Sequence, residues 1–126
     1  SSGTYVRSLA ADLGSSLGGG AHLAALRRTA VGPFELSEAH DLEHLELLPM
    51  ADGVRHLGHL VVDAEVSAAV CHGRVLDAEQ LGLAAPIQPD TGPWAVLSDQ
   101  GALLAVYQRR DDQRAKPAIV LAVDAG

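Results

Sequence analysis

The feature that most constrains the fold is a run of three glycines, Gly18 to Gly20, which divides the first 34 residues into two unlike halves. Glycine readily adopts the left-handed conformation in which many helices end. Before the run, Thr4 or Ser2 is expected to cap a helix. The apolar residues of this helix recur at helical spacing and predict one stripe, formed by Val6, Leu9, Ala10, Leu13 and Leu17.

Residues 23–31 follow the glycines and predict a β-strand, which Gly32-Pro33 ends. Successive side chains of a strand point to opposite faces. Leu26 and Arg28 would therefore share one face, and Arg27 would lie on the other. The two neighbouring arginines cannot reach the same surface from a regular strand.

Charge is distributed unevenly along the chain, whose net charge is −7. Residues 1–34 contain three arginines and one aspartate, which gives +2, whereas residues 35–126 contain six basic and fifteen acidic residues, which gives −9. Contacts to phosphate supply most of the affinity for nucleic acid. If the chain binds RNA, the first stretch is therefore where we expect the contact.

Residues 35–49 read as a connector with a short helix. Asp41 can cap this helix, Leu42, Leu45 and Leu48 lie on one side of it, and Pro49 ends it. Residues 50–58 read as a loop, which makes them the expected domain boundary.

The remaining residues predict a small, mainly β unit. A short strand at residues 60–62 precedes a helix that Asp63 caps and Gly73 ends, with Val66, Ala69 and Val70 facing inward. Further strands are expected at residues 75–76, 94–97, 102–108 and 118–123, with a hairpin turn at residues 99–101. Residues 109–114 are interpreted as a charged hairpin tip of mixed sign, with contact to RNA as the alternative.

Composition excludes several classes of protein. With 126 residues, 48% of them hydrophobic, the chain can form one small domain, or a piece of a domain with a second small one. No apolar run approaches a membrane span. The single cysteine, Cys71, excludes an internal disulfide and fits the cytoplasm. His40 and His44 lie four residues apart but are interpreted as exposed histidines, so we expect no metal and no cofactor.

Five short motifs occur in a characteristic order and spacing. They are Gly3-Thr4-Tyr5-Val6-Arg7, Asp12-Leu13-Gly14, Gly20-Ala21-His22-Leu23, Leu26-Arg27-Arg28-Thr29 and Gly32-Pro33-Phe34. Together they closely resemble the last conserved part of the TruB-type tRNA pseudouridine synthases. In that family this block closes the catalytic domain, and a small PUA-like RNA-binding domain follows it. The resemblance implies an α+β fold, with residues 1–49 as the C-terminal piece of the catalytic domain and residues 59–126 as the PUA-like domain.

The resemblance also implies roles for individual residues. Arg7 would be the cation that pairs with the family's nucleophilic aspartate, Tyr5 would lie beside the flipped base, and Leu26 would pack against the pocket. Of Arg27 and Arg28, one would meet RNA phosphate and the other an internal carboxylate. The family's aspartate lies in an upstream segment that these 126 residues do not contain, so the chain alone is expected to be inactive.

Three functions fit the sequence. The first is a part of a bacterial, stand-alone tRNA pseudouridine synthase that acts on a T-loop uridine, with the T-arm of tRNA as partner. The second is a non-catalytic PUA-like RNA-binding module, and the third is a small acidic domain that binds protein. The motifs favour the first, and the acidic C-terminal region favours the bacterial enzyme over the RNA-guided synthases of archaea and eukaryotes. The protein is expected to be a monomer.

Overall fold

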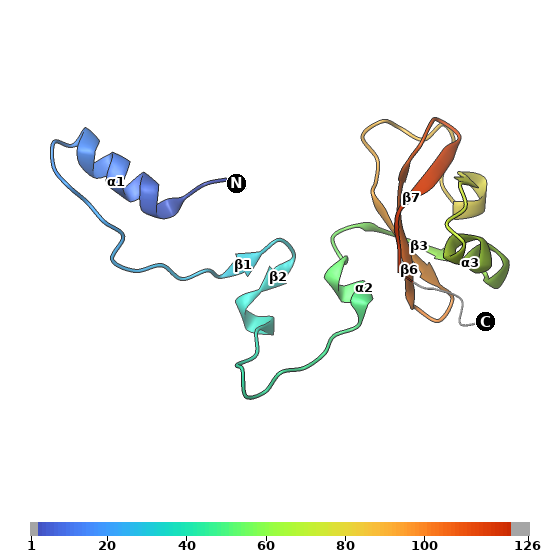
Figure 1. Ribbon diagram of the computed structural model, residues 1–126, viewed down its shortest axis with the longest axis horizontal. Helices are drawn as coiled ribbons and strands as arrows, with labels where there is room; N and C mark the ends of the chain where they lie inside the picture. Colours follow the sequence, from blue (N-terminus) through green and yellow to red (C-terminus); the bar gives the residue numbers. More distant parts are fainter. Residues whose placement is uncertain (1–2, 122–126) are drawn as a thin grey trace. The chain divides into compact units, whose positions relative to one another are not determined.

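The computed structural model describes residues 3–121 and divides after Ala39 into two compact units, residues 1–39 and residues 40–126. The fold is mixed α+β, with one short hairpin in the first unit and one five-stranded sheet in the second (Figure 1). Within the described part of the chain, no helix has the length and apolar character needed to cross a bilayer.

The first unit contains one helix and one hairpin. Helix α1 (Val6–Ser16) is followed by β1 (Ala30–Val31), β2 (Phe34–Glu35) and the 3-10 helix η1 (Leu36–Glu38). The backbone amide of Glu35 donates to Glu38 Oε2 over 2.9 Å, which anchors η1. The predicted strand at residues 23–31 is wrong except at its last two residues, because residues 23–29 have no neighbouring strand to which they can hydrogen-bond.

Helix α1 ends at its predicted signal but begins one residue later than expected. Its N-cap is Tyr5, whose side chain makes no capping bond, and not Thr4; Ser2 lies outside the described residues. The predicted end at the glycines is confirmed, since Gly18 follows the helix with a φ of 80°. The residues of the predicted apolar stripe, from Val6 to Leu17, are largely exposed within this unit, so the stripe is not buried there.

The connector does not form the predicted helix. The Oδ1 atom of Asp41 accepts bonds from the amides of Glu43 and His44, at 3.2 and 2.9 Å, so the predicted cap forms but only a single turn follows it. Instead, a short helix, α2 (Met50–Gly53), lies where a loop was predicted. Three residues that follow the connector pack on the sheet, namely Ala51, Val54 and Leu57. This packing stabilises α2, whereas the connector has no such contact.

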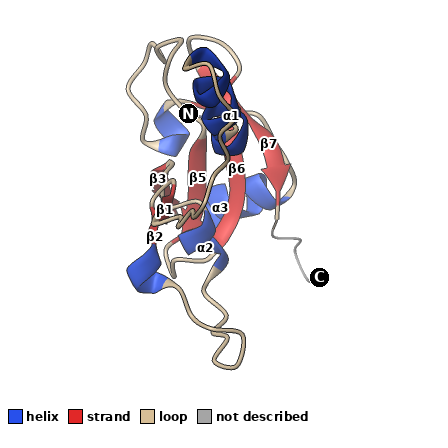
Figure 2. Ribbon diagram, turned by 90° about the vertical axis from the view of Figure 1, so that its left-hand side faces the viewer, coloured by secondary structure: helices blue, strands red, loops and turns tan. Residues whose placement is uncertain are grey.

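The sheet of the second unit has the strand order β3-β5-β6-β7-β4. Its strands are β3 (Gly58–Val62), β4 (Leu76–Asp77), β5 (Trp94–Ser98), β6 (Leu103–Arg109) and β7 (Arg114–Val120). Strand β3 runs parallel to β5, and every other neighbouring pair is antiparallel. The strands β5 and β6 lie side by side at its centre (Figure 2). Their pairing and that of β6 with β7 each contain a register shift, which is typical of a strongly curved sheet.

The predicted strands and the predicted helix of this unit are confirmed, with small changes at their ends. Helix α3 (Ala64–Cys71) is capped by Asp63, whose Oδ1 accepts from the Val66 amide over 2.9 Å. The turn at residues 99–101 joins β5 to β6 as predicted, and the Ser98 amide donates to Ala102 O across it. Strand β7 begins four residues earlier than expected, and residues 122–123 of its predicted range lie outside the described residues.

Hydrophobic clusters lie on both faces of the sheet. The main cluster joins the sheet to α3 and to the 3-10 helix η2 (Glu79–Leu81), and its members include Val62, Val70, Leu76, Leu81, Val96, Leu104 and Tyr107. The smaller cluster contains Ala95, Leu97 and Leu103, which contact the residues after the connector. The second unit therefore has its own core.

Tyr107 is the largest fully buried side chain of this core. Its hydroxyl donates to the backbone oxygen of Arg74 over 2.7 Å, which joins β6 to the chain segment after α3. Burial raises the pKa of Tyr107, and the nearby Cys71 thiol adds to this effect. The neutral phenol is therefore the form that the fold stabilises.

We predict that Tyr107→Phe lowers the free energy of unfolding by about 1 kcal/mol at neutral pH, because the Arg74 oxygen loses its bond. Since the folded-state pKa is raised, the stabilisation is complete below the ordinary tyrosine value of about 10 and is lost as pH rises beyond it. Urea titrations followed by Trp94 fluorescence should show a smaller alkaline loss in Tyr107→Phe. Tyr5→Phe, at the only other tyrosine, is the matched control; equal alkaline losses in the two variants would contradict the assignment.

Candidate functional site

The start of α1 presents the first two candidate residues, Tyr5 and Arg7. Tyr5 is the N-cap of the helix and is 77% exposed, and Arg7 is its second residue and is also exposed. Between residues 3 and 121, no carboxylate forms an ion pair with Arg7. The guanidinium is therefore available to a partner that these residues do not supply.

The other three candidates, Leu26, Arg27 and Arg28, lie in the extended segment between α1 and β1. Leu26 is 63% exposed, so it has no pocket to line within this unit. Arg28 borders an open hollow of about 240 Å³ together with residues of the hairpin, whereas Arg27 does not. The two arginines thus lie in different surroundings, although neither has a carboxylate partner among the described residues.

Gly14 determines how this extended segment approaches α1. It is the only buried residue of the helix among those described. A Cβ atom at this position would lie 2.5 Å from both the Cβ and the backbone nitrogen of Ala21, which is closer than real Cβ contacts come. Only glycine lets the chain return alongside the helix at this point without a shift. Gly14 therefore helps to position the segment that carries the three candidates.

The five candidates form no hydrogen bond or ion pair between their side chains in the described part of the chain. Their side chains supply three guanidinium groups and one phenol, and one acid, Glu35, lines the same hollow as Arg28. Guanidinium groups can bind phosphate and can hold a carboxylate. None of the five side chains is suited to attack a sugar.

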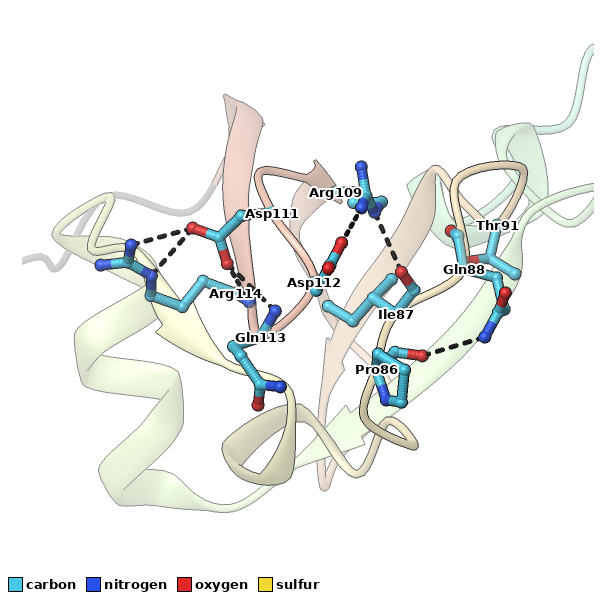
Figure 3. Close-up of polar contacts among 9 residues, drawn as sticks. All are labelled: Pro86, Ile87, Gln88, Thr91, Arg109, Asp111, Asp112, Gln113 and Arg114. Atoms are coloured by element: carbon cyan, nitrogen blue, oxygen red, sulfur yellow. Dashed lines mark hydrogen bonds and ion pairs between the residues drawn. The ribbon is translucent and has the colours of Figure 1, made fainter.

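The hairpin tip of the second unit holds two of its arginines, Arg109 and Arg114, in internal contacts (Figure 3). Arg109 Nε donates to Ile87 O over 3.0 Å, and the same guanidinium bonds to Asp112. Arg114 bonds to Asp111 at 3.0 and 2.9 Å. The Gln113 amide and the Arg114 side chain lower the pKa of Asp111. The predicted tip of mixed sign is confirmed, and these pairs reduce the attraction of the tip for phosphate.

A further basic group lies beside α3, and the sequence analysis did not single it out. A hollow of about 260 Å³ is lined by Arg74 and His72, with Glu65 and Gln80 nearby. The His72 Nδ1 atom lies 2.7 Å from Ala68 O at the end of the helix. The sequence could have indicated this group, because Gly73 ends the helix and His72 and Arg74 flank it. Positive charge is favourable at the C-terminal end of a helix.

The histidines of the connector contact acids. His44 Nδ1 lies 2.7 Å from Asp41 Oδ1, and His40 Nε2 lies 3.9 Å from Glu46 Oε2. Over residues 3–121, no group of three or more His, Cys, Asp or Glu side chains is arranged to hold a metal ion.

Comparison with known proteins gives consistent matches. The family described as "tRNA pseudouridylate synthase B C-terminal domain" matches residues 7–67. A protein of Corynebacterium aurimucosum named "tRNA pseudouridine synthase B" is 43% identical over 112 residues, which cover 83% of this chain and 38% of that protein. Its namesake from Nocardia farcinica is 40% identical over 127 residues, covering 96% and 38%. The chain therefore spans about two fifths of the length of these relatives.

We predict that Gly14→Ala displaces the segment after α1, because the added Cβ would overlap Ala21. The helix itself should gain about 1 kcal/mol, since alanine is the better helix former. Circular dichroism should therefore show equal or greater helix content, while amide chemical shifts of Ala21 to Leu23 should move. Gly19→Ala, where a Cβ has open space, is the control. Unchanged shifts in Gly14→Ala would show that Ala21 does not pack there.

Proposed function

Because the chain belongs to the tRNA pseudouridine synthase B family, to whose C-terminal part it corresponds, we propose that it is part of an enzyme that converts a T-loop uridine of tRNA to pseudouridine. The observation that carries this proposal is the similarity to proteins of that name across both structural units. The proposed partner is the T-arm of tRNA, and the proposed setting is the cytoplasm, with the enzyme acting as a monomer.

The reaction determines what the site must supply. Uracil is detached from its sugar, turned and rejoined through carbon, and a base within folded RNA must first be flipped out. A carboxylate near the sugar has to remain ionised in a pocket that excludes water, although desolvation favours its protonated form. A neighbouring cation offsets this effect and fixes the position of the carboxylate.

Arg7 is our candidate for that cation. It lies at the start of α1 with an unpaired guanidinium among the described residues, and the motif that contains it supports the assignment. A planar guanidinium can bond a carboxylate through two parallel contacts, which a lysine ammonium cannot do. In this proposal, the carboxylate comes from the part of the enzyme that these 126 residues do not include.

Tyr5 and Leu26 are proposed to border the flipped base. Both side chains are exposed in the structure, at 77% and 63%. An aromatic ring and an aliphatic side chain can supply the apolar, water-poor surroundings that the reaction requires, once the other wall of the pocket is present.

RNA binding is proposed for both units. Of Arg27 and Arg28 in the basic first stretch, one would contact the phosphate backbone and the other an internal carboxylate. Residues 59–126 are proposed to act as the PUA-like RNA-binding domain, with residues 1–49 as the end of the catalytic domain. In the second unit, Arg74 offers a cation for such a contact in the hollow beside α3, which Glu65 also lines.

The test of Arg7 needs a whole enzyme. We define the chimera as the part of the Corynebacterium aurimucosum relative that precedes the matched region, joined to this chain. In the chimera, Arg7→Ala and Arg7→Lys should each lower the single-turnover rate on the order of a hundredfold or more, because one preorganised electrostatic contact is lost. The affinity for tRNA should fall much less. Rates from rapid quench and dissociation constants from filter binding measure the two effects.

Arg110→Ala is the matched control, since Arg110 is exposed and lies outside the proposed site. It should react at the parent rate, and the 126-residue chain alone should form no pseudouridine. An Arg7→Ala chimera with a nearly normal rate, or one that loses only affinity, would make Arg7 a phosphate contact and not the partner of the nucleophile.

The phosphate contacts make a separate prediction. Of Arg27→Ala and Arg28→Ala, one should weaken tRNA binding by the chimera and reduce the slope of log affinity against log salt by about one, and the other should leave the slope unchanged. The variant that leaves the slope unchanged identifies the arginine that meets a carboxylate. Reduced slopes in both variants would show that both arginines contact phosphate, and unchanged slopes in both would show that the basic first stretch does not bind the backbone.

A further inference from the structure

The connector carries the most exposed apolar residues of the second unit. Leu47 is 99% exposed and Leu42 is 87% exposed. Three more large apolar side chains of the same stretch are also exposed, namely Leu45, Leu48 and Met50. Most isolated apolar residues at a surface need no explanation, but here five exposed ones occur within nine residues of chain, with Glu43, His44 and Glu46 between them.

The second unit itself offers no place for these leucines. Neither of its hydrophobic clusters includes a residue from positions 40–50. The outer face of β5 and β6 already packs against Ala51, Val54 and Leu57. The leucines of the connector are therefore not displaced core residues of this unit.

The sequence of the connector has the pattern of an amphipathic helix, although the structure shows only one turn there. Leu42, Leu45 and Leu48 would share one side, and Glu43, Glu46 and Leu47 would lie on the other. A helix of this length is unstable in water unless its apolar side packs against another surface. The irregular backbone is thus what the sequence predicts for an amphipathic segment without a partner.

We infer that residues 41–48 form a docking helix whose leucine side packs onto the upstream part of the enzyme, so that the connector joins the PUA-like unit to the catalytic body. This inference rests on the proposed function. The family match, residues 7–67, runs through the connector, and the larger part of the relatives' length lies outside the matched region.

A second copy of the chain is a poorer partner for this segment. The chain carries a net charge of −7, and two connectors would bring Asp41, Glu43 and Glu46 of each copy close together. Like charges at short range oppose association. An apolar surface within the same polypeptide avoids this repulsion.

Hydrogen–deuterium exchange tests the inference independently of catalysis. Amides of residues 42–48 should exchange rapidly in the 126-residue chain and at least about tenfold more slowly in the chimera, because a docked helix opens rarely. The double variant Leu45→Ser/Leu48→Ser should remove that protection. The control, Glu43→Ser/Glu46→Ser, alters the polar side of the same segment and should keep it.

The outcomes separate this inference from the proposed function. Protection in a chimera that makes no pseudouridine would support docking while the proposed function failed. Rapid exchange in an active chimera, or equal protection in both double variants, would overturn docking. Concentration-dependent protection in the 126-residue chain alone would also overturn it, in favour of self-association.

Should the chimera be insoluble, its two parts can be produced together from separate genes. Recovery of the upstream part with this chain should then depend on Leu45 and Leu48 but not on Glu43 and Glu46. Recovery that is equal in all variants, or no complex with the parent chain, would refute the docking helix.

Discussion

The second unit depends on central strands that are covered on both faces. Residues Trp94 to Leu97 of β5 are all buried, although their side chains alternate between the two sides of the sheet. Helix α3 and η2 supply the cover on one side, and the residues around α2 supply it on the other. A strand in this position must be apolar throughout, and its sequence is. The strand and the elements packed on its two faces therefore stabilise each other, and together they form the core of this unit.

The first unit is held together differently. The backbone bonds of α1 and those of the hairpin and 3-10 turn are local to each element, and Gly14 is the one buried residue that the structure describes in α1. Most of its large apolar side chains remain exposed, although Leu23 and Phe34 of the family motifs are partly buried. The hydrophobic effect favours covering such a surface. This contrast supports the proposal that the unit completes a larger catalytic body, as the coverage of about two fifths of the relatives' length also indicates.

Prediction from the sequence succeeded for elements whose signals and pairing partners lie close together in the chain. Asp63, the apolar side of α3 and Gly73 specify a helix locally, and the turn at residues 99–101 joins two strands that pair with each other. It failed at residues 23–29, at the connector and at α2. In the first two cases the pattern was that of a regular element, but residues 23–29 pair with no strand among the described residues, and the connector contributes to neither hydrophobic cluster. At α2 the opposite holds, because contact with the sheet stabilises a segment whose own sequence resembles a loop.

The candidate site was predicted from resemblance, and no local physical signal could replace it. An exposed arginine at the start of a helix is unremarkable in isolation, and the electrostatics of Arg7 become informative only beside a carboxylate. Catalysis by a preorganised ion pair requires both charges to be held in position before the substrate arrives. Backbone contacts such as the one between Gly14 and Ala21 can position the segment that carries Arg27 and Arg28 within the unit. They cannot create low-dielectric surroundings, in which the attraction within an ion pair is stronger, because the pair must then be enclosed by protein on all sides. The exposed basic surface of the first unit is thus what one wall of such a site would look like without the others.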